Sequence, residues 1–327
     1  MKFRIGTFNA MDLIHPGVPY YERDPYTESE YDQKLAWIGH QLHRMEAQIV
    51  GFQEVFHEEA LKQACDQLDL YKHGTVIAPL TDGTRPRLGL ATSLEVVGEP
   101  EVFKHFPDDF DINLEGVELP MKRFNRPVLK VRLQLTKKHV VTVFVAHLKS
   151  KRPLTQGNEP NAKQLALGHA RAQIMRAAEA AALRMLIVDE IEQSKQPVIL
   201  IADLNDAVHA ITSRIVSGYP PYRYLLREEK LREWDVLLYS TYEIQARSSR
   251  RDVNYSHIFN GEYEALDHIY VSQEFYRFNP RRIGEVEQVQ FYNDHVVDPT
   301  LTEEHGDRIV SDHGQVVATL EMREGHF

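Results

Sequence analysis

The sequence predicts one α/β domain built in layers, and three observations support this fold class. Short apolar runs that suit buried strands recur along the chain, and segments with helical spacing lie between them. No internal repeat, low-complexity tract or Pro/Gly/Ser linker divides the chain. Strands and helices mixed in one undivided chain are typical of layered α/β folds, so we expect residues 1–327 to form a single domain.

Six segments are expected to be strands. In chain order they span residues 3–8, 49–52, 140–146, 198–202, 265–271 and 315–320. The clearest is 198–202, because five apolar residues without a polar break are typical of a strand that is covered on both faces. Polar residues follow, interrupt or precede all six strands: Asn9, Gln53–Glu54, His147, Asp203, Asp267 and Asp312–His313.

Three helices are expected between these strands. Residues 31–45 have apolar side chains near helical spacing at Leu35, Ile38, Leu42 and Met45. Residues 58–68 show a similar pattern. Residues 161–193 form a long Ala-rich run with many strong helix formers, which predicts one extended helix.

One acidic segment, residues 106–120, shows no clear periodicity. A surface loop or lid is therefore expected there. It does not match the calcium-binding loop of an EF-hand, because Gly116 falls too late in the segment.

Composition limits the class of protein. With 43% hydrophobic and 26% charged residues the chain is typical of a soluble globular protein. No stretch approaches the roughly eighteen apolar residues of a membrane helix, so no membrane insertion is expected. A lone cysteine, Cys65, excludes an intramolecular disulfide and fits a reducing compartment. The N-terminus enters a strand-like alternation without a signal-peptide core, so a cytoplasmic location is expected.

Positive charge is clustered in an otherwise acidic chain. The net charge of −10 argues against tight nonspecific binding to duplex nucleic acid, although a local field can still attract a phosphate-bearing substrate. Basic loops lie at residues 81–87, 121–127, 147–153, 247–251 and 279–282. Two interpretations stay open: these cations are solvated loop charge, or those nearest to the strand ends converge on one phosphate groove, namely Arg85, Arg87, Arg126, Lys149 and Arg152.

The polar strand ends are candidates for a ligand site. Taken alone, each has a structural explanation; Asp203, for example, suits a helix cap or a turn. The alternative is chemical, because a carboxylate can bind a hard cation or accept a proton, and the amide of Asn205 can hold a water or a phosphate oxygen. Several such residues at the ends of apolar strands favour the chemical interpretation, since layered α/β folds place ligand sites there.

Six short motifs occur in a fixed order: FNAMDL (8–13), FQEV (52–55), AHLKS (146–150), ADLND (202–206), LDHIYVS (266–272) and SDHG (311–314). Together they resemble the endonuclease/exonuclease/phosphatase, or DNase I-like, superfamily over residues 3–320. Within it, segment 255–272 is most similar to bacterial extracellular-nuclease-like members. The resemblance implies a four-layer α/β sandwich, in which two facing mixed β-sheets are flanked by helices.

The resemblance also implies a metal site and a water-activating group. Glu54 would be the main ligand of Mg²⁺, with Mn²⁺ or Ca²⁺ as substitutes, and Asn9 and Asp312 would complete or orient this site. Asp203 would position or deprotonate the attacking water, and Asn205 would hold the phosphate or that water. Many members have an acid two residues after the first Asn, where this chain has Met11. Asp12, one position later, therefore receives no assigned role.

The remaining roles concern the phosphate. His313 would contact the scissile phosphate and stabilise charge in the transition state, and Asp267 would orient His313 and raise its pKa. His147 would be a second imidazole donor, close to the leaving oxygen. Arg126, in an arginine-proline element, would clamp the phosphate. Tyr20, Tyr21 and Tyr26 are interpreted either as base-stacking residues or as plain packing.

The expected function is divalent-metal-dependent phosphodiester hydrolysis by in-line attack of an activated water, with DNA or RNA as the substrate. The alternative is a phosphatase or phosphodiesterase that acts on a small-molecule or lipid-headgroup phosphoester. A third hypothesis, a catalytically inactive binding module, is disfavoured because the acids, amides and histidines of the motifs are all present.

Overall fold

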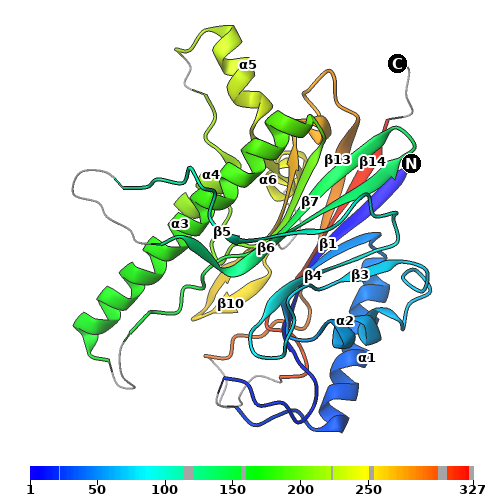
Figure 1. The fold of residues 1–327 in the computed structure, drawn as a ribbon, viewed down its shortest axis with the longest axis vertical. Helices are drawn as coiled ribbons and strands as arrows, with labels where there is room; N and C mark the ends of the chain where they lie inside the picture. Colours follow the sequence, from blue (N-terminus) through cyan, green and yellow to red (C-terminus); the bar gives the residue numbers. More distant parts are fainter. Residues whose placement is uncertain are drawn as a thin grey trace.

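Two six-stranded mixed sheets face each other in the computed structural model, which describes residues 1–21, 23–113, 121–155, 160–221, 224–249, 254–300 and 308–323 (Figure 1). The first sheet has the order β13 (Gly284–Tyr292), β14 (Gln315–Met322), β1 (Lys2–Leu13), β2 (Ile49–Val55), β4 (Arg87–Thr92) and β3 (Thr75–Ile77). The second has the order β5 (Glu101–His105), β6 (Arg123–Thr136), β7 (His139–His147), β8 (Val198–Asp203), β12 (Asp267–Ser272) and β9 (Leu238–Ser240).

Helices cover the outer faces of the two sheets, so the predicted four-layer sandwich is confirmed (Figure 1). Helices α1 (Glu28–Met45) and α2 (Glu58–Cys65) pack on the first sheet, and α3 (Ala162–Ser194) and α4 (Ile211–Ser217) on the second. The other described elements are α5 (Arg227–Asp235), α6 (Thr241–Ser248), a 3-10 turn (Gln273–Phe275) and the hairpin β10 (His257–Phe259) and β11 (Glu262–Glu264). Among the described residues, no helix is long and apolar enough to cross a membrane.

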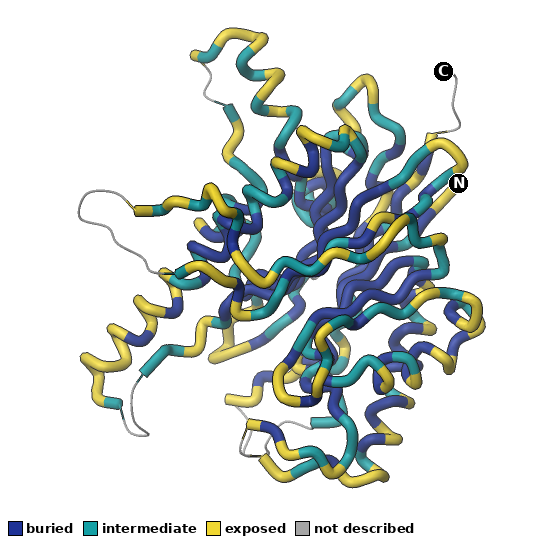
Figure 2. The backbone as a smooth tube through the Cα atoms, viewed as in Figure 1, coloured by how far each residue is buried: buried dark blue, intermediate teal, exposed yellow. Residues whose placement is uncertain are grey.

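The main core lies between the sheets. Ile5 and Leu90 of the first sheet belong to one buried cluster with Val143 and Ile201 of the second. Figure 2 shows these strands as the buried centre of the molecule, with exposed residues at its periphery. The sheets approach each other closely at Gly51 of β2, where an added Cβ would lie 2.7 Å from Cγ2 of Ile201. A side chain at this position would therefore push the sheets apart.

All six predicted strands are present, as β1, β2, β7, β8, β12 and β14. The predicted helices are also present, although α2 ends at Cys65, three residues before the predicted end. α1 begins three residues earlier than predicted, because Thr27 and Glu30 form a capping box before its first turn. α3 is continuous from its own capping box at Asn161, and the exposed start of α3 projects beyond the body of the molecule (Figure 1).

Segment 106–120 is described only in part, because residues 114–120 lie outside the described residues. Residues 106–113 form no helix or strand, as predicted for a loop. Phe106 anchors this stretch: its buried ring packs against Phe110 at 4.8 Å and Phe124 at 4.9 Å between centroids.

Candidate active site

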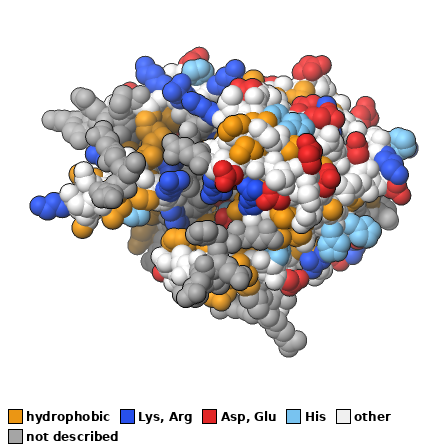
Figure 3. Space-filling view, turned by 90° about the horizontal axis from the view of Figure 1, so that it is seen from below, with side chains coloured by type: hydrophobic (Ala, Val, Ile, Leu, Met, Phe, Trp, Pro, Cys, Tyr) orange, Lys and Arg blue, Asp and Glu red, His pale blue; other side chains and the backbone are white. Residues whose placement is uncertain are grey.

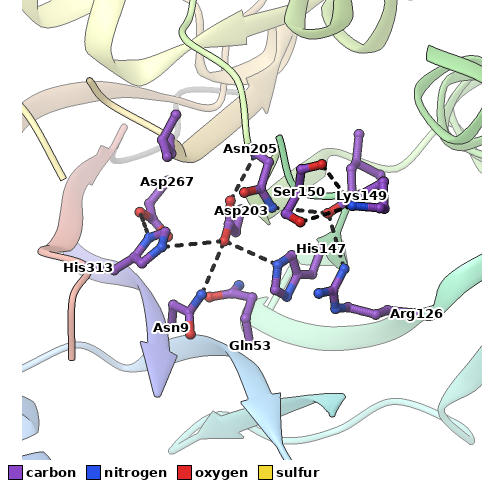
Figure 4. A network of polar contacts seen from close by, with 12 residues as sticks. Asn9, Gln53, Arg126, His147, Lys149, Ser150, Asp203, Asn205, Asp267 and His313 are labelled. Carbon is purple, nitrogen blue, oxygen red and sulfur yellow. Dashed lines mark hydrogen bonds and ion pairs between the residues drawn. The ribbon is translucent and has the colours of Figure 1, made fainter. Parts of the chain in front are cut away.

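Asp203 is the centre of a buried polar cluster at the carboxyl end of β8. Only 1% of the residue is exposed. Its Oδ2 accepts a hydrogen bond from Asn9 Nδ2 at 3.1 Å, and lies 3.3 Å from His147 Nε2 and 4.0 Å from His313 Nε2. Its Oδ1 accepts a hydrogen bond from the backbone N–H of Asn205 at 2.9 Å. Figure 4 shows these four residues around Asp203, so five of the predicted site residues meet at one carboxylate.

Strand register explains how residues far apart in sequence meet here. β7 and β8 run parallel with His147 opposite Asp203, and β12 runs antiparallel to β8 with Asp267 opposite Asp203. Asn9 comes from β1, in the facing sheet, where it is paired with Gln53 of the parallel strand β2. The site therefore lies at the edge of the sandwich where these parallel strands end, and both sheets contribute to it.

Burial raises the pKa of the Asp203 carboxyl to about 7. His313 opposes this shift, whereas the carboxylates of Asp267 and Glu54 add to it. A carboxylate with a pKa near neutrality can accept a proton from a bound water at neutral pH, which is the property that a general base requires.

His313 forms a close pair with Asp267. His313 Nδ1 lies 2.7 Å from Asp267 Oδ2, and both side chains are buried. Burial alone would lower the pKa of His313, but Asp267 and Asp203 outweigh it and raise the pKa well above the usual range. The backbone N–H of Asp267 donates to Ser256 Oγ at 3.1 Å, which fixes the segment that carries the carboxylate. His313 is thus held as an imidazolium whose Nε2 faces Asp203.

His147 is the second imidazole of the site and is fully buried in contact with Asp203. Burial, with Arg126 and His313 nearby, lowers its pKa well below the usual range. His147 is therefore neutral where His313 is charged. Among the described residues, Nδ1 of His147 has no hydrogen-bond partner.

A second group of acids, Asp12, Glu54 and Asp312, gathers beside Asp203. Burial raises the pKa of Asp12 to about 7, with a further contribution from Glu54 and a smaller one from Asp312, against the opposing effects of Arg23 and Lys34. Asp12 is 5% exposed, and its Oδ1 has no hydrogen-bond partner among the described residues. Asp12, to which the sequence assigned no role, is therefore part of the acidic cluster.

A bulge in β1 accounts for the position of Asp12. Asn9 pairs with Gln53 and Leu13 with Val55, so β1 has two more residues than β2 over this stretch. The extra residues are accommodated by left-handed backbone at Met11 (φ 47°) and Asp12 (φ 59°). Asp12 lies one position later in the sequence than the acid of many superfamily members, and the bulge turns Asp12 toward the acidic cluster.

Left-handed backbone also occurs at Glu54 (φ 62°) and Asn205 (φ 54°). Non-glycine residues seldom adopt this conformation, and strained residues of this kind concentrate at functional sites. The amide of Asn205 is fixed by a hydrogen bond from its Nδ2 to the carbonyl of Leu148 at 3.1 Å.

The acidic cluster fits a hard divalent cation. Its donors are carboxylate oxygens, as Mg²⁺ prefers, and Asp12 presents a buried oxygen that lacks a protein partner. Among the described residues, two groups of acids and histidines have ligand atoms that all lie within 4.8 Å of one another: Asp203, Asp267 and His313, and His257, Asp312 and His313. Asp12, Glu54 and Asp312 together do not form such a group. Asn9 differs from the acids, because its Nδ2 donates to Asp203 and its Oδ1 accepts from the backbone of Met11, so its amide orients the Asp203 carboxylate.

His257 is a site residue that the sequence did not indicate. Its ring lies 4.9 Å from that of His313 between centroids, and it reaches the site from β10. Burial lowers its pKa, and His313 adds to this, whereas Asp312 and Asp267 oppose it. β10 is a three-residue strand without an apolar run, so no strand-end pattern precedes His257.

Arg126 approaches the site from a bulge in β6. Phe103 pairs with Val128 but His105 pairs with Arg123, so β6 has extra residues around Pro127, which has no N–H to donate. Arg126 Nη1 donates to the carbonyl of Leu148 at 3.3 Å, and its buried Nε has no hydrogen-bond partner among the described residues.

Glu179 of α3 is a second residue that the sequence did not indicate. Its buried carboxylate accepts hydrogen bonds from the backbone N–H groups of Asn125 and Lys149, both at 2.7 Å. One side chain thereby ties the Arg126 bulge and the loop after His147 to the same helix. The sequence carries no signal for it, because its partners are backbone N–H groups.

The cations of the basic loops differ in their surroundings, and only some of them line a groove near the site. Arg85 and Arg87 line a groove near the site, as described below. The amine of Lys149 instead donates to the carbonyls of Ser150 and Arg152 at 3.0 and 3.1 Å, so it does not face the cluster.

Tyr20, Tyr21 and Tyr26 also differ in their surroundings. Tyr20 and Tyr26 are buried and stack at 5.6 Å between centroids, which confirms packing for both. Tyr21 is 57% exposed, beside Phe56 at the rim of the site, so base stacking stays a prediction for it alone.

Comparison with solved structures identifies the fold. The chain matches an endonuclease/exonuclease/phosphatase protein from Bacteroides vulgatus with a TM-score of 0.57 and 13% identity, over 99% of this chain and 100% of that one. It matches truncated TDP2 from Caenorhabditis elegans with a TM-score of 0.56 and 14% identity, over 98% of both chains. The human Nocturnin catalytic domain, solved with a bound sulfate, matches with a TM-score of 0.55 and 12% identity, over 98% of this chain and 94% of that one. No family model and no curated protein matches the sequence.

Proposed function

We propose that this chain is a divalent-metal-dependent phosphodiester hydrolase whose substrate is DNA or RNA. The observation that carries the proposal is one buried carboxylate, Asp203, in contact with two imidazoles and an amide and beside a cluster of acids. In-line displacement at phosphorus requires a base for the water, positive charge for the phosphate oxygens and a donor for the leaving oxygen. The fold shared with endonuclease/exonuclease/phosphatase proteins supports the same reaction class.

Asp203 takes the proton of the attacking water. Asn9 and the backbone N–H of Asn205 hold one oxygen each of its carboxylate, so the base has a fixed orientation before substrate binds. The N–H at Nε2 of the His313 imidazolium donates to a phosphate oxygen as charge develops there, and Asp267 keeps the ring in place. His147, on the other side of Asp203, donates toward the leaving oxygen.

Arg126 and the acidic cluster complete the phosphate site. Arg126 binds a non-bridging oxygen through the guanidinium nitrogens that the Leu148 carbonyl does not engage. Glu54, Asp312 and Asp12 would hold Mg²⁺, with Mn²⁺ or Ca²⁺ as substitutes, and the bound ion would supply positive charge to the phosphate.

A substrate panel tests this proposal. We expect the purified chain to cut plasmid, single-stranded DNA or RNA and to hydrolyse bis-p-nitrophenyl phosphate faster than p-nitrophenyl phosphate. EDTA should abolish the activity, and Mg²⁺ or Mn²⁺ should restore it. Preference for the monoester with no nucleic acid cut would instead support a small-molecule or lipid-headgroup phosphatase. Turnover that persists in EDTA would remove the metal from the mechanism.

Glu179→Gln tests how Arg126 is positioned. Glutamine offers one oxygen where two backbone N–H groups donate, so one of them would lose its acceptor at a cost of about 1–3 kcal/mol. We expect kcat/KM for bis-p-nitrophenyl phosphate to fall about tenfold as the clamp loosens. Glu190→Gln is the matched control, because Glu190 is a buried acid at the other end of α3 that contacts Thr142 and Lys130. An equal loss of kcat/KM in both variants would mean that Glu179 acts only through stability.

A further inference from the structure

A large groove lies next to the candidate active site. It has a volume of about 1150 Å³ and runs between the loop before β4 and the bulged edge of β5 and β6. Five cations line it: Arg85, Arg87, Lys104, Lys122 and Arg123. They come from three separate segments, at residues 85–87, 104 and 122–123, so the fold, and not a local run of charge, brings them together.

These cations are available to a ligand. None of the five forms an ion pair with another described residue, and all but the half-buried Arg87 are exposed. The groove also holds two acids: Glu58 pairs with Lys62 at 2.5 Å, and Asp82 accepts hydrogen bonds from Thr84 and is attracted by Arg87, so the five cations outnumber the acids. The groove is thus an electropositive channel in a chain whose net charge is −10.

The groove adjoins two of the proposed site residues through their neighbours in the chain. Asn125 and Pro127 line it, and these are the neighbours of Arg126 on either side. Arg87 pairs in the sheet with Val55, the residue after Glu54. Figure 3 views this end of the molecule and shows Lys and Arg gathered toward the upper left of the face, whereas Asp and Glu are more frequent on its right.

We propose that this groove binds the sugar-phosphate backbone of a single nucleic-acid strand beside the scissile phosphate. This inference rests on the proposed function, because it assigns the groove to the same substrate. Contacts of Lys and Arg with the backbone phosphates are independent of sequence, and five such cations line the groove beside apolar side chains such as Leu80 and Met121. Its volume suits a few nucleotides of one strand.

Neutralising the groove tests the inference. The triple variant R85Q/K104Q/K122Q should bind a labelled single-stranded DNA of about 12 nucleotides at least about tenfold more weakly than wild type at 0.1 M salt. Binding is measured by fluorescence anisotropy in EDTA, so that no cleavage intervenes. Loss of three phosphate contacts should also make the plot of log K against log salt less steep by about 2. Hydrolysis of bis-p-nitrophenyl phosphate should be unchanged, because that substrate is too small to reach the groove.

The control variant K137Q/K138Q/K195Q removes the same charge from the opposite ends of the strands, where all three lysines are exposed. Its affinity and salt slope should equal those of wild type. Equal weakening in both triple variants, tighter binding of duplex than of single strand, or preference for vesicles that contain phosphoinositides would each overturn the inference. Failure of the proposed function gives a different result: wild type would then bind the strand through the groove but hydrolyse no phosphodiester.

Discussion

Asp203→Asn is expected to lower kcat for phosphodiester cleavage by about 10²- to 10⁴-fold, the range that removal of a general base produces. The amide keeps the size and shape of the carboxylate but cannot accept the proton of the water. One oxygen remains to accept the N–H of Asn205, so the turn after β8 should persist. The melting temperature should therefore stay within about 4 °C of wild type. Rates on bis-p-nitrophenyl phosphate and thermal denaturation measure the two quantities.

Asp206→Asn is the control for this variant. Asp206 lies three positions later and its carboxylate contacts Arg176. Its amide variant should keep most of the activity, because no proton transfer is assigned to it. Wild-type rates in Asp203→Asn would exclude Asp203 as the base, and equal losses in the two variants would point to a disturbed turn.

His313→Ala is expected to lower kcat by about 10²- to 10³-fold, as removal of a preorganised donor to a developing oxyanion does. Asp267→Asn should have a smaller effect, because Asp267 touches the ring and not the substrate in the proposed mechanism. The two effects should not multiply: the double variant should be no slower than His313→Ala, since Asp267 has no ring left to orient. Single-turnover rates of the four proteins complete this cycle.

Independent effects of the two substitutions would contradict the proposed relation. If the double variant were slower than His313→Ala by the full factor of Asp267→Asn, Asp267 would act on the reaction directly. A metal ligand would behave in this way. Asp267 is a candidate for that role, because its carboxylate forms a group of possible metal ligands with Asp203 and His313. Titration of activity with Mg²⁺ would then show a weaker apparent affinity in Asp267→Asn.

Residues that end apolar strands could be predicted from the sequence. Asp203 and His147 follow runs of buried side chains, and register then makes them neighbours. Because β7 and β8 are parallel neighbours, their carboxyl ends lie side by side at the same edge of the sheet. The same holds for Asn9 and the strand β2 beside it.

Residues placed by irregular backbone or by helices could not be predicted in the same way. Asp12 reaches the acidic cluster through a bulge with two left-handed residues, which a strict alternation of strand residues does not allow for. Glu179 acts from the middle of a helix, where its partners are backbone N–H groups and leave no mark in the sequence. β6 was not predicted as a strand, since Pro127 interrupts its alternation near the start.

The hydrogen bonds that join distant parts of the sequence at the candidate active site have a consequence for the order of folding. The hydrogen bond from Asn9 to Asp203 joins residues 194 positions apart, and Ser311 donates to the carbonyl of Asn9 across 302 positions. Closing such loops costs entropy before any contact compensates for it, so these bonds form only after both sheets have docked on each other. A piece of the chain that lacks Ser311 and His313 has neither this bond to Asn9 nor the imidazole that faces Asp203. The proposed activity therefore requires segments from both β1 and the stretch before β14, and a fragment that contains only one of them should be inactive.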